Sequence, residues 1–93
     1  MEVVDLPTIQ STEITMPYHL GFHLRVVARF VTFVRQFHST IHVRKGKFSA
    51  DGKNILGLLL LAAAWKSTLS IEAEGDDAQK AIQGIESFFQ LEH

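Results

Sequence analysis

The feature that most constrains the fold is a repeated exchange between two kinds of apolar periodicity along the chain. Segments in which apolar and polar residues alternate predict half-buried strands, and they occupy residues 11–16, 40–44, 47–50 and 68–73. Apolar residues spaced three and four apart predict helices, which occupy residues 27–37, a short segment from residue 55, and residues 78–89. The predicted element order is therefore β-α-β-β-α-β-α.

This order favours one architecture. A strand, a helix and then a hairpin indicate an antiparallel sheet, and helices must cover its apolar side because an isolated hairpin is not stable in water. We predict an α+β open-faced β-sandwich, in which a four-stranded antiparallel sheet carries three helices on one face. Lys45-Gly46 is the predicted hairpin turn, Asn54 is predicted to cap the short helix, and Asp76 with Gln79 forms a capping-box pattern before the last helix.

The same periodicities predict which side chains face the core. On the strands these are Thr12, Ile14, Met16, Ile41, Val43, Phe48, Leu69, Ile71 and Ala73. On the helices they are Val27, Phe30, Val31, Val34, Phe37, Ile55, Leu58, Leu59, Ala62, Ala78, Ala81, Ile82, Ile85, Phe88 and Phe89. Arg25, Arg29, Thr32 and Arg35 then fall on the solvent side of the first helix.

Length and composition indicate one globular domain. The chain has 93 residues, of which 46% are apolar and 20% charged, and it contains no cysteine. Disulfides, thiolate catalysis and cysteine-ligated metal centres are therefore excluded, and we expect a cytoplasmic protein. We expect residues 1–10 to form an extended or flexible N-terminal extension and residues 11–90 to form the domain. Residues 91–93, "LEH", resemble the remnant of a purification tag.

Charge and hydropathy exclude two classes of function. The longest apolar run, residues 55–65, falls well short of the roughly 20 residues that span a bilayer, so we predict no membrane insertion. Residues 1–53 carry 7 basic and 4 acidic side chains (+3), whereas residues 54–93 carry 2 basic and 6 acidic ones (−4). This balance gives little support for nucleic-acid binding, but a basic first half would suit an acidic protein surface.

The stretch PYHLGFHLRVVARF, residues 17–30, places a histidine where the first helix begins. Gly21 permits a tight turn, so His23 and Arg25 fall in the first helical turn, where up to four backbone N–H groups lack an intrahelical partner. These donors and the helix dipole favour an anion, and the guanidinium of Arg25 matches phosphate geometry. A neutral imidazole is a nucleophile near neutral pH, so His23 could accept a phosphoryl group there.

Two simpler interpretations of these histidines compete with that hypothesis. A single histidine at a helix start is more often a surface or capping residue than a catalytic one. His19 and His23 are four residues apart and would form a metal pair on a helix. Pro17 and Gly21 make this segment a poor helix and no third ligand is in view, so we predict no metal site.

Three segments, in the same order, resemble the HPr family of histidine-containing phosphocarrier proteins of the phosphotransferase system. HLGFHLRVVARF is similar to the family's phosphorylation motif, Gly-Leu-His-x-Arg-Pro-Ala. DGKNILGLLLLAA is similar to its second-helix segment, and LSIEAEGDDAQKAIQGIESFF to its last strand and helix. The resemblance runs from about Ser11 to Phe89.

The resemblance implies a phosphocarrier with no cofactor. His23 would accept a phosphoryl group from an Enzyme I-type protein and pass it to an Enzyme IIA-type acceptor, in sugar transport or in a regulatory branch, and Arg25 would stabilise the phosphate. Such a chain is a carrier with a phosphohistidine intermediate rather than a stand-alone enzyme. The alternative is a non-catalytic HPr-like regulatory or protein-interaction domain. The partner surface implied for the first two helices comprises Ala28, Arg29, Thr32, Ile55, Leu56 and Leu59.

The sequence departs from the family pattern at three places. Val26 replaces the proline that follows the motif's arginine, which restores a backbone N–H but removes a preset φ. Asn54 replaces the family's regulatory serine and cannot be phosphorylated. Trp65 and Lys66 occupy turn positions before the last strand, and we expect Trp65 to pack as core rather than to enlarge a partner surface.

Overall fold

The computed structural model describes residues 8–61 and 63–91. Its elements follow the predicted order: β1 (Ile9–Thr15), α1 (Leu24–Val34), β2 (Thr40–Lys45), β3 (Phe48–Asp51), α2 (Ile55–Leu60), β4 (Thr68–Glu74) and α3 (Ala78–Leu91). The first strand begins at Ile9, two residues before the predicted start of the domain. The predicted core position Ala62, most of the N-terminal extension (residues 1–7) and residues 92–93 lie outside the described residues.

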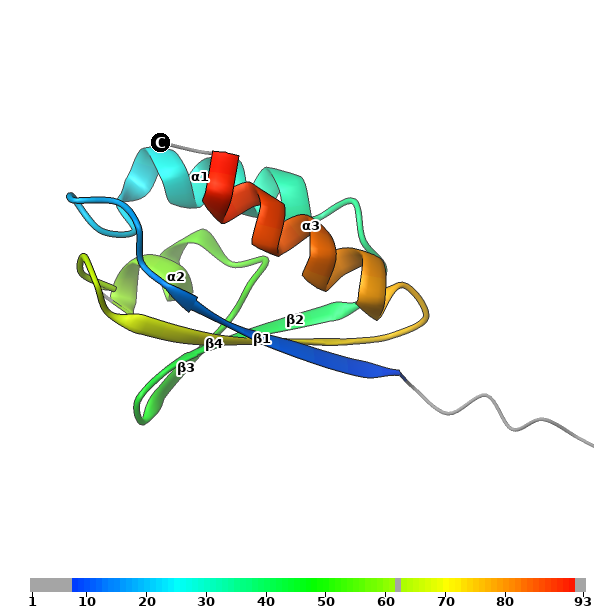
Figure 1. Cartoon of the computed structure of the whole chain (residues 1–93). Helices are drawn as coiled ribbons and strands as arrows, with labels where there is room; N and C mark the ends of the chain where they lie inside the picture. The colour runs from blue at the N-terminus through cyan, green and yellow to red at the C-terminus, as the bar shows by residue number, and fades with distance from the viewer. Residues whose placement is uncertain (1–7, 62, 92–93) are drawn as a thin grey trace, which may run out of the picture.

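The four strands form one antiparallel sheet in the order β1-β4-β2-β3, and all three helices lie on one face of it (Figure 1). This confirms the predicted fold class. The central strand β4 is the clearest case of the predicted alternation, since Leu69, Ile71 and Ala73 are fully buried between more exposed neighbours. Burial of this stripe requires the helices, because the opposite face of the sheet is open to water.

Aromatic side chains join α1, α3 and the segment before α1. Phe30 of α1 is fully buried, and its ring centroid lies 5.4 Å from that of Phe22, 5.5 Å from that of Phe88 and 5.6 Å from that of Phe89. Tilted and edge-to-face ring pairs at these distances add to the stabilisation that burial provides. One cluster therefore ties the segment before α1 to the C-terminal half of α3.

Among the predicted core positions that the structure describes, Phe48 is wrong, and six others are only half-buried: Thr12, Ile14, Phe37, Ile55, Leu59 and Phe88. Phe48 is 68% exposed, although it pairs with Lys45 on the same face as the buried Val43, because the β2–β3 hairpin tip extends past the helices (Figure 1). Phe37 lies beyond the end of α1 and is half-buried against the core. Alternation identified the correct face in β3, but it did not show how far the helices cover that face.

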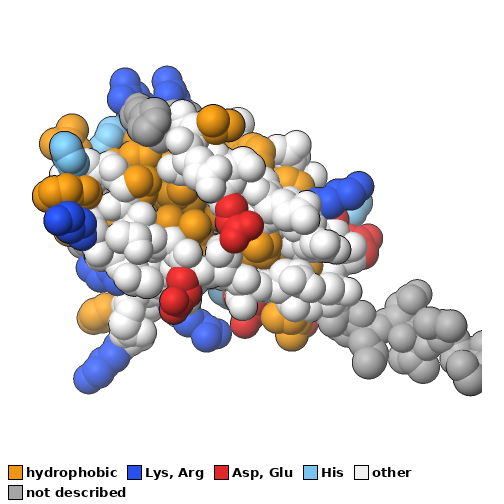
Figure 2. Space-filling view, viewed as in Figure 1, with side chains coloured by type: hydrophobic (Ala, Val, Ile, Leu, Met, Phe, Trp, Pro, Cys, Tyr) orange, Lys and Arg blue, Asp and Glu red, His pale blue; other side chains and the backbone are white. Residues whose placement is uncertain are grey.

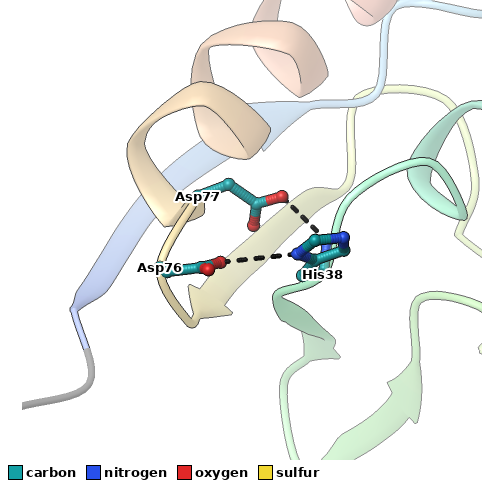
Figure 3. Close-up of side chains that lie close together, drawn as sticks. All are labelled: His38, Asp76 and Asp77. Carbon is teal, nitrogen blue, oxygen red and sulfur yellow. Dashed lines mark hydrogen bonds and ion pairs between the residues drawn. The ribbon is translucent and has the colours of Figure 1, made fainter.

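The predicted capping box at Asp76 and Gln79 is also wrong, because α3 begins at Ala78 and Asp77 occupies the capping position. The carboxylate of Asp77 instead reaches across to the α1–β2 connection (Figure 3). It accepts hydrogen bonds from the backbone N–H groups of His38 (2.8 Å) and Ser39 (2.9 Å) and from the buried Ser39 hydroxyl. This carboxylate therefore fastens two segments that are distant in the sequence.

The hydrogen bonds change the titration of that carboxyl group. Burial raises the pKa of Asp77, but the hydrogen bonds from the Ser39 hydroxyl and from the two backbone N–H groups outweigh burial, so the net pKa is lowered. A lowered pKa in the folded state means that ionised Asp77 stabilises the fold above its unfolded pKa of about 3.9. That contribution is lost as the pH falls through the folded-state pKa.

No helix among residues 8–61 and 63–91 combines the length and the hydrophobicity that crossing a bilayer requires.

We predict that Asp77→Asn lowers the free energy of unfolding by about 1–3 kcal/mol at neutral pH, because the substitution removes the charge from three hydrogen bonds. Urea titrations between about pH 5 and pH 2 should also show a shallower loss of stability than in the wild type. The matched control is Asp76→Asn, since Asp76 is 79% exposed and its carboxylate lies 3.8 Å from His38 Nδ1. Equal effects of the two substitutions would contradict the proposed role of Asp77.

Candidate functional site

His23 occupies the N-cap position of α1, with φ −87° and ψ 173°, and its side chain makes no capping hydrogen bond. A typical N-cap side chain uses its oxygen to accept a hydrogen bond from the N–H of the second or third helical residue. The imidazole is half-buried and leaves these donors untouched. His23 thus holds a capping position in the backbone without using its ring as the cap.

The backbone donors beside this ring have no protein partner. The carbonyl of His23 accepts the first helical hydrogen bond, from Val27 N–H at 2.9 Å. Across the described parts of the chain, no acceptor bonds the N–H groups of Leu24, Arg25 or Val26. These groups point toward the N-terminal end of the helix, where the dipole favours negative charge. A tetrahedral anion on the His23 ring would supply the missing acceptors.

His23 lines a shallow depression of about 300 Å³. The other lining residues are Pro17, Tyr18, His19, Leu20 and Arg25. None of them is acidic, and the two exposed polar residues among them, His19 and Arg25, can donate hydrogen bonds to an anion. The structure therefore brings together the predicted pair His23 and Arg25, and it adds His19, which the sequence offered only as half of a metal pair.

The segment before His23 is fixed by a close backbone approach. Gly21 has φ +74°, and a Cβ placed there would lie 2.6 Å from the carbonyl oxygen of Ala63. That oxygen accepts the N–H of the next residue, Phe22, at 2.9 Å. Glycine is needed at position 21 both for its conformation and for its lack of a side chain. The turn that presents His23 is therefore built against the loop that follows α2.

This second loop carries Trp65, and the prediction that Trp65 packs in the core is wrong. Its side chain is 46% exposed, and its ring meets that of His19 edge-on, with centroids 4.6 Å apart and an interplanar angle of 74°. The Nζ atom of Lys66 lies 4.5 Å from the centroid of the Trp65 ring. Lys66 has φ +69°, so it adopts the left-handed conformation that usually favours glycine. Trp65 and its two neighbours thus lie on the surface beside the depression.

The residues predicted for partner binding fall into two groups. On α1, Ala28, Arg29 and Thr32 line a groove of about 610 Å³ with Phe33, Gln36 and Phe88. On α2, Leu56 is 65% exposed, whereas Ile55 and Leu59 are half-buried and pack against the core. The two helices pack against each other, so both groups belong to neighbouring elements, but α2 offers less free surface than the prediction implied.

Several exposed leucines were not predicted as site residues. Leu20 is 82% exposed, Leu24 60% and Leu60 75%. Leu60 follows the exposed Leu56 by one helical turn, so both leucines lie outside the core stripe of α2; this spacing could have identified them. Figure 2 shows hydrophobic, basic and histidine side chains gathered at the end of the molecule where α1 begins, whereas the acidic side chains visible in this view lie elsewhere.

Asn54 caps α2 as predicted, since its Oδ1 accepts the Gly57 N–H at 3.0 Å. At the other end of the molecule, ligand atoms of His38, Asp76 and Asp77 lie within 4.8 Å of one another (Figure 3). Both oxygens of Asp77 already accept protein hydrogen bonds, and His38 and Asp76 are 84% and 79% exposed. This cluster is explained by the attachment of the α1–β2 connection to α3.

Comparison with known sequences gives a consistent result. The sequence model of a family described as "PTS HPr component phosphorylation site" matches residues 10–90. The phosphocarrier protein HPr of Neisseria meningitidis is 35% identical over 66 residues, which cover 71% of this chain and 74% of that protein. The phosphocarrier protein HPr of Haemophilus influenzae is 38% identical over 65 residues, which cover 70% of this chain and 76% of that protein.

Solved structures show the same architecture. The crystal structure of HPr from Thermoanaerobacter tengcongensis superposes with a TM-score of 0.80 at 32% sequence identity. The superposition covers 90% of this chain and 99% of that one. The similarity therefore includes the sheet, the three helices and the turn before α1.

We predict that Gly21→Ala destabilises the protein by roughly 2–4 kcal/mol, because it adds a backbone clash to the cost of a positive φ. Gly46→Ala is the matched control: Gly46 has φ +59°, and nothing lies within 4 Å of its hypothetical Cβ, so only the conformational cost of about 1 kcal/mol should remain. Urea unfolding followed by circular dichroism measures both. Equal losses would mean that the approach to Ala63 does not constrain the turn.

Proposed function

Since the chain belongs to the HPr family of phosphocarrier proteins, we propose that His23 accepts a phosphoryl group from an Enzyme I-type protein and passes it to an Enzyme IIA-type acceptor. The single observation that supports this assignment is the half-buried imidazole at the N-cap of α1, beside three backbone N–H groups that no acceptor among the described residues bonds. A ring that is accessible to a partner and adjacent to unpaired donors is what reversible transfer requires.

The chemistry follows from this geometry. A ring nitrogen of neutral His23 attacks the phosphorus of the donor, the new P–N bond forms, and the bond to the donor breaks with its electron pair left on the donor. The transferred group carries negative oxygens. The N–H groups of Arg25 and Val26 occupy the second and third helical positions, from which donors reach an N-cap acceptor, so they can bind these oxygens.

Two side chains complete the anion site. Arg25 lines the same depression as His23 and is exposed, so its guanidinium can reach a phosphoryl group on the ring. Val26 stands where the family motif has proline, and unlike proline it retains a backbone donor. We therefore propose that transfer through His23 survives this replacement and gains one hydrogen bond to the phosphoryl group.

The proposal extends to the organisation of the chain. We propose that residues 11–90 form the carrier unit together with Ile9 and Gln10, which pair with β4, that the residues before Ile9 are an extension, and that residues 91–93 are a tag remnant. The α1 and α2 residues Ala28, Arg29, Thr32, Ile55, Leu56 and Leu59 are proposed to contact the protein partners. Asn54 caps α2 without a hydroxyl, so control by phosphorylation at that position is not part of the proposed function.

We predict that His23→Ala abolishes phosphorylation by Enzyme I and phosphoenolpyruvate, because the substitution removes the nucleophile. The measurement is incorporation of acid-labile phosphate, with the modified residue located by mass spectrometry. His42→Ala is the matched control, since His42 lies on β2, outside the depression that contains His23, and its removal should leave phosphorylation unchanged. Absence of phosphohistidine in the wild type would overturn the carrier function and favour a non-catalytic HPr-like domain.

We predict that Arg25→Ala slows phosphoryl transfer about 10- to 100-fold, because a charge-assisted hydrogen bond to the transferred group is worth roughly 1.5–3 kcal/mol. Rapid-quench measurement of kcat/KM with Enzyme I tests this. Arg35→Ala removes an equally exposed arginine just after the last residue of α1 and should change the rate by less than about twofold. Similar rates for the two variants would exclude a direct role for Arg25.

A further inference from the structure

We propose that Trp65 is a specificity-determining anchor of the partner interface, which extends beyond α1 and α2 onto the loop of residues 63–67. The proposed partner is a protein that presents an apolar patch surrounded by carboxylates. This inference rests on the proposed function and names residues that the resemblance to the family did not assign. It is supported by the exposure of Trp65, by its connection to the His23 site and by the charge of the surrounding surface.

Trp65 is an exposed aromatic side chain held in place by its neighbours. Although 46% exposed, its ring contacts the imidazole of His19 edge-on and lies 4.5 Å from the Nζ atom of Lys66. Edge-to-face and cation–π contacts of this kind limit the orientations of the ring. A tryptophan that is already ordered loses little conformational entropy on binding, which favours its use as an interface anchor.

The loop that carries Trp65 is continuous with the His23 site. Two backbone hydrogen bonds join this loop to the segment before α1. The Met16 N–H donates to the Ser67 carbonyl oxygen at 2.8 Å, and the Lys66 N–H donates to the Met16 carbonyl oxygen at 3.0 Å. His19, which touches Trp65, lines the same depression as His23. A protein that docks closely enough to reach the His23 ring therefore meets His19 and the edge of the Trp65 ring.

The composition of this surface indicates what would bind it. Residues 14–50 and 52–71 contain no aspartate or glutamate, so every fully charged side chain in α1, in α2 and in their connecting loops is basic. The segments that adjoin this loop, the turn before α1 and the helices α1 and α2, also carry exposed apolar side chains, namely Leu20, Leu24, Leu56 and Leu60. An apolar centre with basic residues around it is complementary to an apolar patch with acidic residues around it.

The chain offers a matched control for this argument. Phe48 is also an exposed aromatic residue, at 68%, but it lies at the tip of the β2–β3 hairpin, away from the helices (Figure 1). Phe48 is exposed because the helices do not cover the sheet face as far as the hairpin tip. It does not line the depression that contains His23. Comparing substitutions of Trp65 and Phe48 therefore distinguishes the effect of a position near the His23 site from the effect of exposed aromatic area.

A 19F label on Trp65 tests the proposal directly, because it is the only tryptophan in the chain. Its indole can be labelled with 5-fluorotryptophan, so that its 19F signal reports contact without interference from partner tryptophans. The probe is unlabelled, unphosphorylated Enzyme I from the source organism, added without phosphoenolpyruvate to the labelled His23→Ala variant. We expect the 19F resonance to shift on binding, although this variant cannot be phosphorylated.

Affinity is then measured by isothermal titration calorimetry with the otherwise native chain. Trp65→Ala should raise the Kd for Enzyme I at least about tenfold, whereas Phe48→Ala should change it less than about twofold. Trp65→Phe should fall between them, because it keeps part of the aromatic contact. Circular dichroism and urea unfolding of each variant establish that it is folded, so that a change in Kd reports the surface.

The outcomes separate this inference from the proposed function. If the wild type is phosphorylated on His23 but Trp65→Ala binds with unchanged affinity, or the 19F signal does not move on binding, the inference is overturned and the carrier function stands. If Enzyme I does not bind the wild type, both are overturned. If Trp65→Ala and Phe48→Ala weaken binding equally, position has no influence and the inference again fails.

Discussion

The presentation of His23 depends on one packing constraint, the burial of the neighbouring side chain of Phe22. Phe22 is 5% exposed and is fixed by ring contacts to Phe30 and Phe89 and by its N–H bond to Ala63. His23 follows a tight turn centred on Phe22, in which the His23 N–H donates to the Gly21 carbonyl at 3.0 Å, and His23 itself has extended backbone dihedrals. Burial of the Phe22 ring therefore anchors the turn from which His23 lines the surface depression. The energy of the aromatic core thus fixes the orientation of the proposed nucleophile before a partner arrives.

The distribution of charge around His23 suits this orientation to binding a phosphoryl group. No acidic side chain lines the depression around His23, and the sequence supplies none between residues 14 and 50. A phosphoryl group on the ring would consequently meet unpaired N–H groups, a guanidinium and the positive end of a helix dipole without opposing charge nearby. The same field would attract an acidic partner surface during encounter. The excess of positive charge near His23 would thus stabilise the bound phosphoryl group and also attract the protein that delivers it.

Sequence periodicity was sufficient for the fold and for the core of the site because both depend on local patterns. The alternation of β4 and the stripe of α1 gave the buried faces, and His23 and Arg25 were identified from their place at a helix start. The errors concern long-range geometry. Exposure of Phe48 and Trp65 depends on where other elements end, which periodicity does not encode. The contact between His19 and Trp65 joins distant segments and could not be predicted from either one.

The residues that precede α3 and α1 are used differently, and this difference separates stability from function. At the start of α3, the carboxylate of Asp77 accepts hydrogen bonds from the backbone of the α1–β2 connection, so these two segments are joined. At the start of α1, the His23 side chain makes no capping hydrogen bond, and within residues 8–61 and 63–91 no acceptor bonds the first N–H groups of the helix.

Val26 shows how α1 tolerates this. Its side chain is 1% exposed, so the first turn is held by core packing rather than by a preset proline φ or a capping side chain. Because packing on the inner face stabilises the turn, the donors on its outer end can stay free for an incoming anion.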